Sequence, residues 1–286
     1  MRTYVMDAFT TERFTGNPAG IVLLEGESEL SDELMQRLAA ELRHSETAFV
    51  QKADGGFSIR YFTPTGEVPL CGHATIASFA LLRTLELIAD GRQRAFTAAG
   101  ELAVDLENGT VFMDMAEPRI LRSLTAGEKA ELYAAFALEE GDCPHGLEPQ
   151  VVSTGLSDII MPVASRSALL RAVQDERAVT ELSRRLDSIG VHMFALGDDD
   201  CTAYCSNFAP LVGINEECAT GTANGALTWY LYRNSLVTPE KTNLFIQGEH
   251  MHRPSRILSL LTLKGGAAKV RIGGSAVMSM ECRVIL

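Results

Sequence analysis

The stretch that decides the fold is Phe62-Thr63-Pro64 followed, after a short interval, by Cys71-Gly72-His73-Ala74-Thr75. The other half of the chain repeats this plan, with Phe208-Ala209-Pro210 leading to Cys218-Ala219-Thr220-Gly221-Thr222. In both copies a glutamate precedes the cysteine, and a run of small, helix-forming residues follows it. The repeat predicts two similar halves, each of which places a thiol beside the start of a helix.

The halves are expected to be separate lobes with an active site in the cleft between them. Residues 1–118 form the predicted N-terminal lobe and residues 119–286 the C-terminal lobe. A final strand, from about residue 274 to 286, is expected to be able to pack back onto the first lobe. A chain of this length accommodates one or two domains, and the repeat favours two.

The predicted lobes belong to the α+β class. Central helices are expected over residues 75–88 and 222–233, and Asn108-Gly109 is the strongest short signal for a β-hairpin. Expected strands outnumber helices, and hairpins outnumber strand–helix–strand units. This pattern favours a mixed or antiparallel sheet rolled around one central helix in each lobe.

Bulk composition excludes several classes of function. The formal net charge is −12 and basic residues do not cluster, which argues against nucleic acids and anionic membrane surfaces as partners. No apolar run reaches the roughly 18 residues of a membrane span, and Asp7 comes too early for a secretion signal. With six sparse cysteines, the expected setting is the cytoplasm, with reduced thiols. The absence of glycine-rich phosphate motifs predicts no nucleotide cofactor.

Two other motifs are weak candidates for metal sites. Cys201 and Cys205 lack a second ligand pair, and their expected setting is a strand. His250-Met251-His252 stands next to Arg253-Pro254, which favours an exposed turn. The sequence therefore predicts no bound metal.

The repeated cysteines carry the most specific chemistry. A thiol just before a helix faces backbone N–H groups without partners and the positive end of the helix dipole, which together stabilise a thiolate. The same N–H groups suit a substrate carboxylate. The alternative for Cys71 and Cys218 is ordinary core packing, since cysteine is among the most buried residue types. Glu46 and His73 are further candidates, each with a bland alternative as a surface glutamate or a structural histidine.

Four motifs in order resemble one known family. They are Gly16-Asn17-Pro18-Ala19-Gly20, Ser45-Glu46-Thr47-Ala48-Phe49, the Cys71 motif and Glu216-Glu217-Cys218-Ala219-Thr220-Gly221-Thr222-Ala223. Together they look like the PhzF-like proteins of phenazine biosynthesis, which belong to the fold group of diaminopimelate epimerase and proline racemase. The resemblance spans nearly the whole chain. It implies a homodimer and acid–base chemistry without a cofactor or a metal.

The resemblance also implies roles for particular residues. The catalytic set would be Glu46 as the main proton shuttle, His73 as its assistant and Glu217 as a second acidic group. Substrate binding would fall on Ser45, Gly72, Ala74, Gly221 and Thr222.

Cys218 departs from the PhzF-like pattern, where proline is expected. With Cys71 it matches instead the two catalytic thiols of the racemase patterns, so both cysteines join the catalytic candidates. Two mechanisms stay open: Glu46 shuttles one proton, or the two thiols act on opposite faces of a stereocentre. The thiol pair is slightly favoured, because Cys218 is the unexpected residue.

The predicted function is therefore that of an isomerase or epimerase. It would move a proton on a small carboxylated metabolite by general acid–base catalysis. A metabolite-binding protein that keeps the fold without the chemistry is the alternative.

Overall fold

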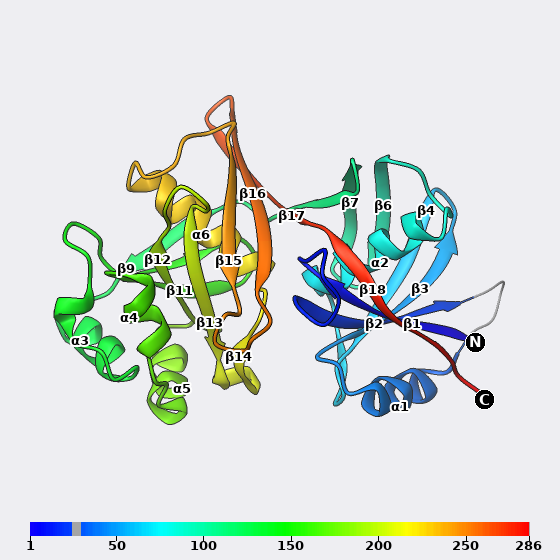
Figure 1. Ribbon diagram of the computed structural model, residues 1–286, viewed down its shortest axis with the longest axis horizontal. Helices are drawn as coiled ribbons and strands as arrows, with labels where there is room; N and C mark the ends of the chain where they lie inside the picture. Colours follow the sequence, from blue (N-terminus) through cyan, green and yellow to red (C-terminus); the bar gives the residue numbers. More distant parts are fainter. Residues whose placement is uncertain (25–29, 286) are drawn as a thin grey trace. The chain divides into compact units, whose positions relative to one another are not determined.

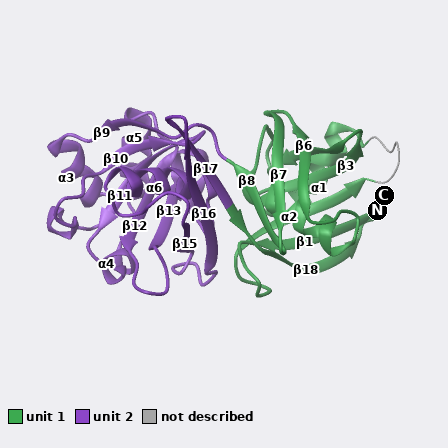
Figure 2. Ribbon diagram, turned by 90° about the horizontal axis from the view of Figure 1, so that it is seen from above, with its two compact units in different colours: residues 1–114, 273–286 green, residues 115–272 purple. Residues whose placement is uncertain are grey.

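Short strands and a few helices alternate along the residues that this computed structural model describes, which are 1–24 and 30–285 (Figure 1). The chain divides into two units, coloured separately in Figure 2. Unit 1 is Met1–Asp114 with Gly273–Leu286, and unit 2 is Met115–Ile272. The chain thus crosses between units after Asp114 and after Ile272. Sequence analysis places the lobe boundary after residue 118 and expects a strand from about residue 274 to 286 to be able to pack back onto the first lobe.

Unit 1 is a mixed sheet curled around one helix. Its elements are β1 (Arg2–Ala8), β2 (Asn17–Leu24), α1 (Asp32–Leu42), β3 (Thr47–Ala53), β4 (Gly56–Phe62), β5 (Glu67–Val68), α2 (Gly72–Thr84), β6 (Gly91–Thr97), β7 (Gly100–Glu107), β8 (Thr110–Asp114) and β18 (Ala276–Arg283). The strand order is β18-β1-β2-β3-β4-β6-β7-β8, with β5 as a short antiparallel partner of β4. Only β2 with β3 and β4 with β6 are parallel among these pairs. Helix α2 contacts β18, β1, β2 and β3 and also β8 at the other end of the order, so the sheet wraps around it.

Unit 2 has the same construction. Its elements are β9 (Arg119–Ser123), α3 (Ala126–Ala134), a 3-10 turn η1 (Glu140–Asp142), β10 (Gln150–Ser153), β11 (Ser157–Val163), α4 (Arg166–Arg171), α5 (Glu176–Arg185), β12 (Gly190–Leu196), β13 (Ala203–Ala209), a 3-10 turn η2 (Pro210–Val212), β14 (Ile214–Glu217), α6 (Gly221–Arg233), β15 (Thr242–Gln247), β16 (Ser255–Lys264) and β17 (Ala267–Gly274). The sheet runs β9-β10-β11-β12-β13-β15-β16, and β14 pairs with β13. Helix α6 contacts β9, β10, β11, β12 and β16.

The two units repeat one order of strand pairings. Strands β1 to β5, helix α2 and strands β6 and β7 correspond to β10 to β14, α6, β15 and β16. In both units the second and third strands are parallel, and the strand after the central helix pairs in parallel with the fourth. Each central helix has 13 residues. The predicted α+β fold with two pseudo-symmetric halves is confirmed.

The central helices lack a polar face. Every residue of α2 from His73 to Leu82 is buried, which requires neighbours on all sides and explains why the sheet closes around it. Sequence analysis places this helix at 75–88, but it begins three residues earlier and ends at Thr84. Glu86, with a φ of 57°, takes the left-handed conformation just beyond this end.

Local residue types fix the hairpin, which was predicted, and both ends of helix α1. Asn108 and Gly109 have φ values of 51° and 82° and join β7 to β8 with Glu107 opposite Thr110, the geometry of a two-residue hairpin. Helix α1 starts with the Ser31 side chain accepting a hydrogen bond from Leu34 N at 3.3 Å. The helix ends at Leu42, and the C-cap residue Arg43 has a left-handed φ of 57° before the chain enters β3.

Candidate active site

Glu46 lies in the short connection between α1 and β3, directly before the strand begins. Its backbone carbonyl accepts a hydrogen bond from Gly20 N at 3.1 Å. A Cβ on Gly20 would lie 2.7 Å from Thr47 Oγ1, so only glycine lets β2 approach β3 this closely. This close approach fixes the backbone that carries the Glu46 side chain.

The Glu46 carboxylate is mostly removed from water. Its side chain is 16 % exposed, and Oε2 is buried without a hydrogen bond to any residue that the structure describes. His73 Nε2 lies 3.4 Å from this oxygen, but the two groups are not aligned as a hydrogen bond. Buried polar atoms usually have partners, and each exception calls for an explanation, of which a catalytic role is one. The Glu46 Oε2 atom is therefore a candidate to accept a proton from a substrate.

His73 stands in the first turn of α2 and joins three candidates into one group. Its side chain is 4 % exposed. Ser45 Oγ lies 3.4 Å from His73 Nε2, and Cys71 Sγ lies 3.4 Å from Nδ1. An imidazole in this place contacts a carboxylate, a hydroxyl and a thiol, so it can hold or pass a proton among them.

Cys71 is the N-cap residue of α2, with extended backbone and no capping hydrogen bond from its side chain. Thr75 secures this position, because its hydroxyl donates to the Cys71 carbonyl at 2.6 Å. The Tyr61 and Thr75 hydroxyls are themselves 2.6 Å apart in the core. Gly72 and Ala74 follow in the first turn, where N–H groups have no partner within the helix and suit an anion. Ala74 is fully buried and Gly72 half-buried.

A second group of polar residues gathers at the start of α6 in unit 2. The N-cap residue Thr220 donates its hydroxyl to Glu217 Oε2. Gln247, fully buried, donates through Nε2 to the Glu217 carbonyl at 2.8 Å and accepts from Thr220 N at 3.2 Å. Asn224 Nδ2 donates to Gln247 Oε1 at 2.7 Å. This network holds the Glu217 side chain against the helix start, where Gly221 and Thr222 are half-buried.

Cys218 does not have the environment that the sequence predicts. It lies two residues before the N-cap Thr220, so it does not occupy the position that Cys71 has on α2. Burial, with the Glu217 charge adding to it, raises the pKa of the Cys218 thiol to about 12, although Arg253 acts in the opposite direction. The expectation of a stabilised thiolate is therefore wrong for Cys218. Burial is the largest cause of the raised pKa.

The turn after β15 fits tightly against Cys218. Gly248 has a φ of 87°, and a Cβ there would lie 2.9 Å from Cys218 Cβ and 2.5 Å from the Arg253 carbonyl oxygen. Arg253 N donates to Gly248 O at 3.1 Å, which closes the turn. The turn places the Arg253 side chain close enough to Cys218 to lower the pKa of its thiol, against the effect of the Glu217 charge.

The structure thus divides the predicted site residues between the units. Ser45, Glu46, Cys71 and His73 gather in unit 1, and Gly72 and Ala74 continue their helix. Glu217, Cys218, Gly221 and Thr222 gather in unit 2. Three residues without a predicted role also shape these groups: Gly20, Gln247 and Arg253. Gly20 stands inside a quoted motif, whereas no local pattern marks the other two.

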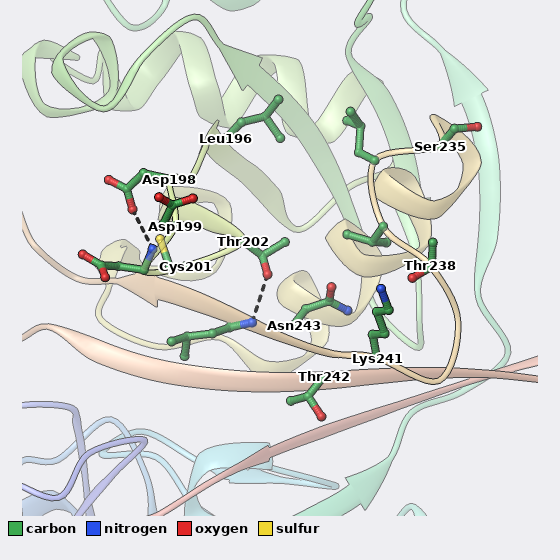
Figure 3. Close-up of a pocket in the computed structure, with 15 residues that line it drawn as sticks. Leu196, Asp198, Asp199, Cys201, Thr202, Ser235, Thr238, Lys241, Thr242 and Asn243 are labelled. Carbon is green, nitrogen blue, oxygen red and sulfur yellow. Dashed lines mark hydrogen bonds between the residues drawn. The ribbon is translucent and has the colours of Figure 1, made fainter.

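A hollow of about 690 Å³ opens elsewhere on unit 2 (Figure 3). Asp198, Asp199, Asp200 and Lys241 are among its lining residues, and none of the predicted site residues lines it. Asp200 N donates to Asp198 Oδ1 at 3.1 Å, and the Tyr204 hydroxyl donates to the Asp198 carboxylate. The Asp198 carboxylate thus accepts hydrogen bonds from the backbone of its own loop and from Tyr204.

No helix within the described part of the chain has the length and apolar character needed to cross a bilayer.

Comparisons with known proteins agree on one family. The sequence profile of the PhzC-PhzF family, described as phenazine biosynthesis-like protein, matches residues 6–282. An uncharacterized isomerase of Clostridium acetobutylicum is 35 % identical over 296 residues, which cover 99 % of this chain and 97 % of that protein.

Solved structures give the same result for the fold. A PhzF-family protein of Bacillus anthracis, solved by crystallography, has a TM-score of 0.90 and 27 % identity, covering 100 % of this chain and 99 % of that one. A hydroxyproline epimerase from Agrobacterium vitis has a TM-score of 0.60 at 13 % identity, covering 99 % and 90 % of the two chains. The second match concerns the fold alone.

Proposed function

Because this chain belongs to the phenazine biosynthesis-like PhzC-PhzF family and is an isomerase by its relatives, we propose that it moves a proton within a small carboxylated metabolite, with Glu46 as the proton shuttle. The observation that carries the proposal is the buried Glu46 Oε2, which has no hydrogen bond in the described residues and stands 3.4 Å from His73 Nε2. A carboxylate with a free, shielded acceptor can take a proton from carbon without first breaking another interaction.

The proposed reaction has two proton transfers. Glu46 removes the proton from a carbon activated by the substrate carboxylate, and the electron pair of the C–H bond delocalises into the substrate. The protonated Glu46, whose side chain is 16 % exposed, exchanges its proton with solvent and returns a proton to another position of the same molecule. N–H groups at the start of α2 would stabilise the negative charge that develops in between.

His73 supports the shuttle through its contacts on both ring nitrogens. Its Nε2 faces Glu46 and Ser45, while Nδ1 faces Cys71. Such an imidazole can balance the charge of Glu46 before and after proton transfer. We further propose that Glu217 serves the same reaction as a second acidic group and that Thr222 contributes to substrate binding.

A two-thiol mechanism has one observation in its favour. The pKa of Cys218 is raised to about 12, so this thiol is protonated at neutral pH, which is the state that a proton donor requires. Cys71 Sγ, 3.4 Å from His73 Nδ1, can pass its proton to the imidazole and suits the base. In this mechanism the configuration of a stereocentre inverts.

Solvent exchange in heavy water tests the proposal. The purified chain is incubated with amino acids, hydroxy acids and dihydroaromatic acids, and deuterium uptake is read by mass spectrometry. Glu46→Gln should lower the exchange rate by about 10²- to 10⁴-fold, the usual contribution of a general base. Glu41→Gln, a matched change on the exposed face of α1, should leave the rate unchanged.

The outcomes separate the alternatives. If Glu46→Gln kept the full rate of deuterium exchange and Cys218→Ser lost it, the two-thiol mechanism would be favoured over the Glu46 shuttle. Saturable binding of a panel member without exchange above background would point to a binding protein and contradict the proposal.

A further inference from the structure

One group of three potential metal ligands forms within residues 1–24 and 30–285: Glu46, Cys71 and His73, each offering a donor atom within 4.8 Å of the others. The residues come from two separate segments, the connection before β3 and the start of α2. The tertiary fold therefore brings together residues that are distant in the sequence. We propose that these three side chains also bind a thiophilic divalent cation, typified by Zn²⁺, and that the bound cation blocks proton transfer.

Two of the donor separations are close to those around a tetrahedral zinc ion, and the third, between Cys71 and Glu46, is within 4.8 Å. Zn–S, Zn–N and Zn–O bonds of about 2.3, 2.0 and 2.1 Å place neighbouring donors about 3.4 to 3.6 Å apart. Glu46 Oε2 lies 3.4 Å from His73 Nε2, and Cys71 Sγ lies 3.9 Å from the same nitrogen. Closing the second distance requires a movement of roughly 0.4 Å, which side-chain rotation supplies.

The state of the Glu46 carboxylate is the second, independent observation. Its Oε2 atom is buried and makes no hydrogen bond to a described residue, so an incoming cation displaces nothing from it. The fourth coordination position is left for water, as in zinc sites that keep an open position.

Charge also favours the ion. Coordination releases the thiol proton of Cys71 to solvent, so one thiolate, one carboxylate and neutral His73 surround two positive charges. The buried complex is then electrically neutral, which lowers the cost of placing charge away from water. Thiolate and imidazole donors select Zn²⁺ and Co²⁺ over Mg²⁺ and Ca²⁺, which prefer oxygen ligands.

The consequence for activity rests on the proposed function. A cation on Glu46 Oε2 occupies the atom that would accept the substrate proton. Zinc would therefore act as a reversible inhibitor that competes with the substrate. Binding of the cation itself does not depend on which substrate the enzyme uses.

Cobalt absorption tests the binding directly. Titration of the reduced, metal-free protein with Co²⁺ should produce a thiolate-to-cobalt charge-transfer band that saturates at about one ion per chain. The band should disappear in Cys71→Ser and persist in Cys218→Ser and Cys282→Ser, which control for another buried and for an exposed thiol. Absence of the band in the wild-type protein would overturn the proposal, as would its persistence in Cys71→Ser.

Equilibrium dialysis with Zn²⁺ gives a second measurement. Glu46→Gln should weaken binding by at least about tenfold, since even outer contacts of metal sites contribute that much. Circular dichroism of each variant shows whether it is folded, and equal zinc affinity in folded wild type, Glu46→Gln and Cys71→Ser would refute the site.

An activity measurement separates the two proposals. Zn²⁺ should suppress deuterium exchange by the wild-type enzyme, and a chelator should restore it. Zinc binding without any exchange activity would sustain the metal site and count against the proposed function. Undiminished exchange with the site saturated would contradict the inhibition.

Discussion

Cys71 and Cys218 have similar neighbours in the sequence and different surroundings in the fold. Cys71 is the N-cap of α2 and touches His73. Cys218 precedes the N-cap of α6 by two residues and packs against Gly248. Both thiols are buried, at 7 % and 4 % exposed. The chemistry of each therefore depends on the charges nearby, of which Glu217 is the main one at Cys218.

The raised pKa of Cys218 predicts how its alkylation depends on pH. With a pKa of about 12, the thiolate fraction rises about tenfold for each pH unit below that value. The rate of modification by iodoacetamide should therefore keep rising from about pH 7 to about pH 9 without a plateau. Peptide mass spectrometry resolves Cys218 from the other thiols, and exposed Cys282 reports the reagent at an accessible site.

Charge variants provide the control for this measurement. Glu217→Gln removes a charge that raises the pKa of Cys218, so modification should become faster. Arg253→Gln removes a charge that lowers it, so modification should become slower. A plateau well below pH 9 in the wild type would show that the thiolate forms near neutrality.

At the scale of elements, the close parallel pairing of β2 and β3 positions Glu46, the proposed proton shuttle. The strands are parallel, with Gly20 opposite Thr47, and Gly20 N holds the carbonyl of Glu46. A Cβ on Gly20 would meet Thr47 Oγ1 at 2.7 Å and Leu42 Cδ1 at 3.2 Å. Packing of this density does not absorb an added methyl group without movement.

Gly20→Ala should impair activity more than stability. The added methyl would push the start of β3 outward and move Glu46, with an expected loss of about ten- to a hundredfold in exchange rate. The free energy of unfolding should fall by about 1–3 kcal/mol. Exchange kinetics and urea unfolding measure the two effects.

A second substitution tests the cause. Thr47→Ala removes the atoms of Thr47 that a methyl on Gly20 would meet, so the double variant should regain part of the lost activity. Strictly additive losses in the double variant would mean that the contact with Thr47 does not explain the defect.

At the scale of the whole molecule, the two units differ in how many chain segments form them: unit 2 is built from one segment and unit 1 from two. Unit 2 is one continuous segment, Met115–Ile272, and Met115 N donates to Val270 O at 2.9 Å near its two ends. Unit 1 needs both termini, because β18 pairs with β1 over the whole of that strand. Without β18, the edge of β1 would carry unpaired backbone groups.

Residues 115–272 alone should therefore fold. A domain of this size has enough core for a cooperative transition, and its helix α6 is enclosed by strands of the same segment. Residues 1–114 alone should aggregate or unfold, since β1 loses its partner. Circular dichroism and thermal unfolding of the separate segments check both statements; an unfolded 115–272 segment would disprove the first.

The local pattern was sufficient to predict much of the fold. The hairpin at Asn108-Gly109 and a helix after each repeated motif depend on neighbouring residues only, so they can be read from the sequence. The exact ends of the helices were harder to predict. Helix α2 was expected to begin at residue 75 but begins at Gly72, and it includes His73, which the fold buries. The pseudo-symmetry could also be predicted from the repeated motifs, since each half of the chain contains the same series of elements.

The sequence by itself determined the class of fold, the family and the identity of the candidate acids and bases, because motifs of adjacent residues record these. Only the tertiary structure decided which candidates touch one another. It placed Glu46 beside His73, left one of its oxygens without a hydrogen bond, and buried Cys218 next to a negative charge. Burial and charge depend on residues distant in the chain, and no local pattern specifies those neighbours.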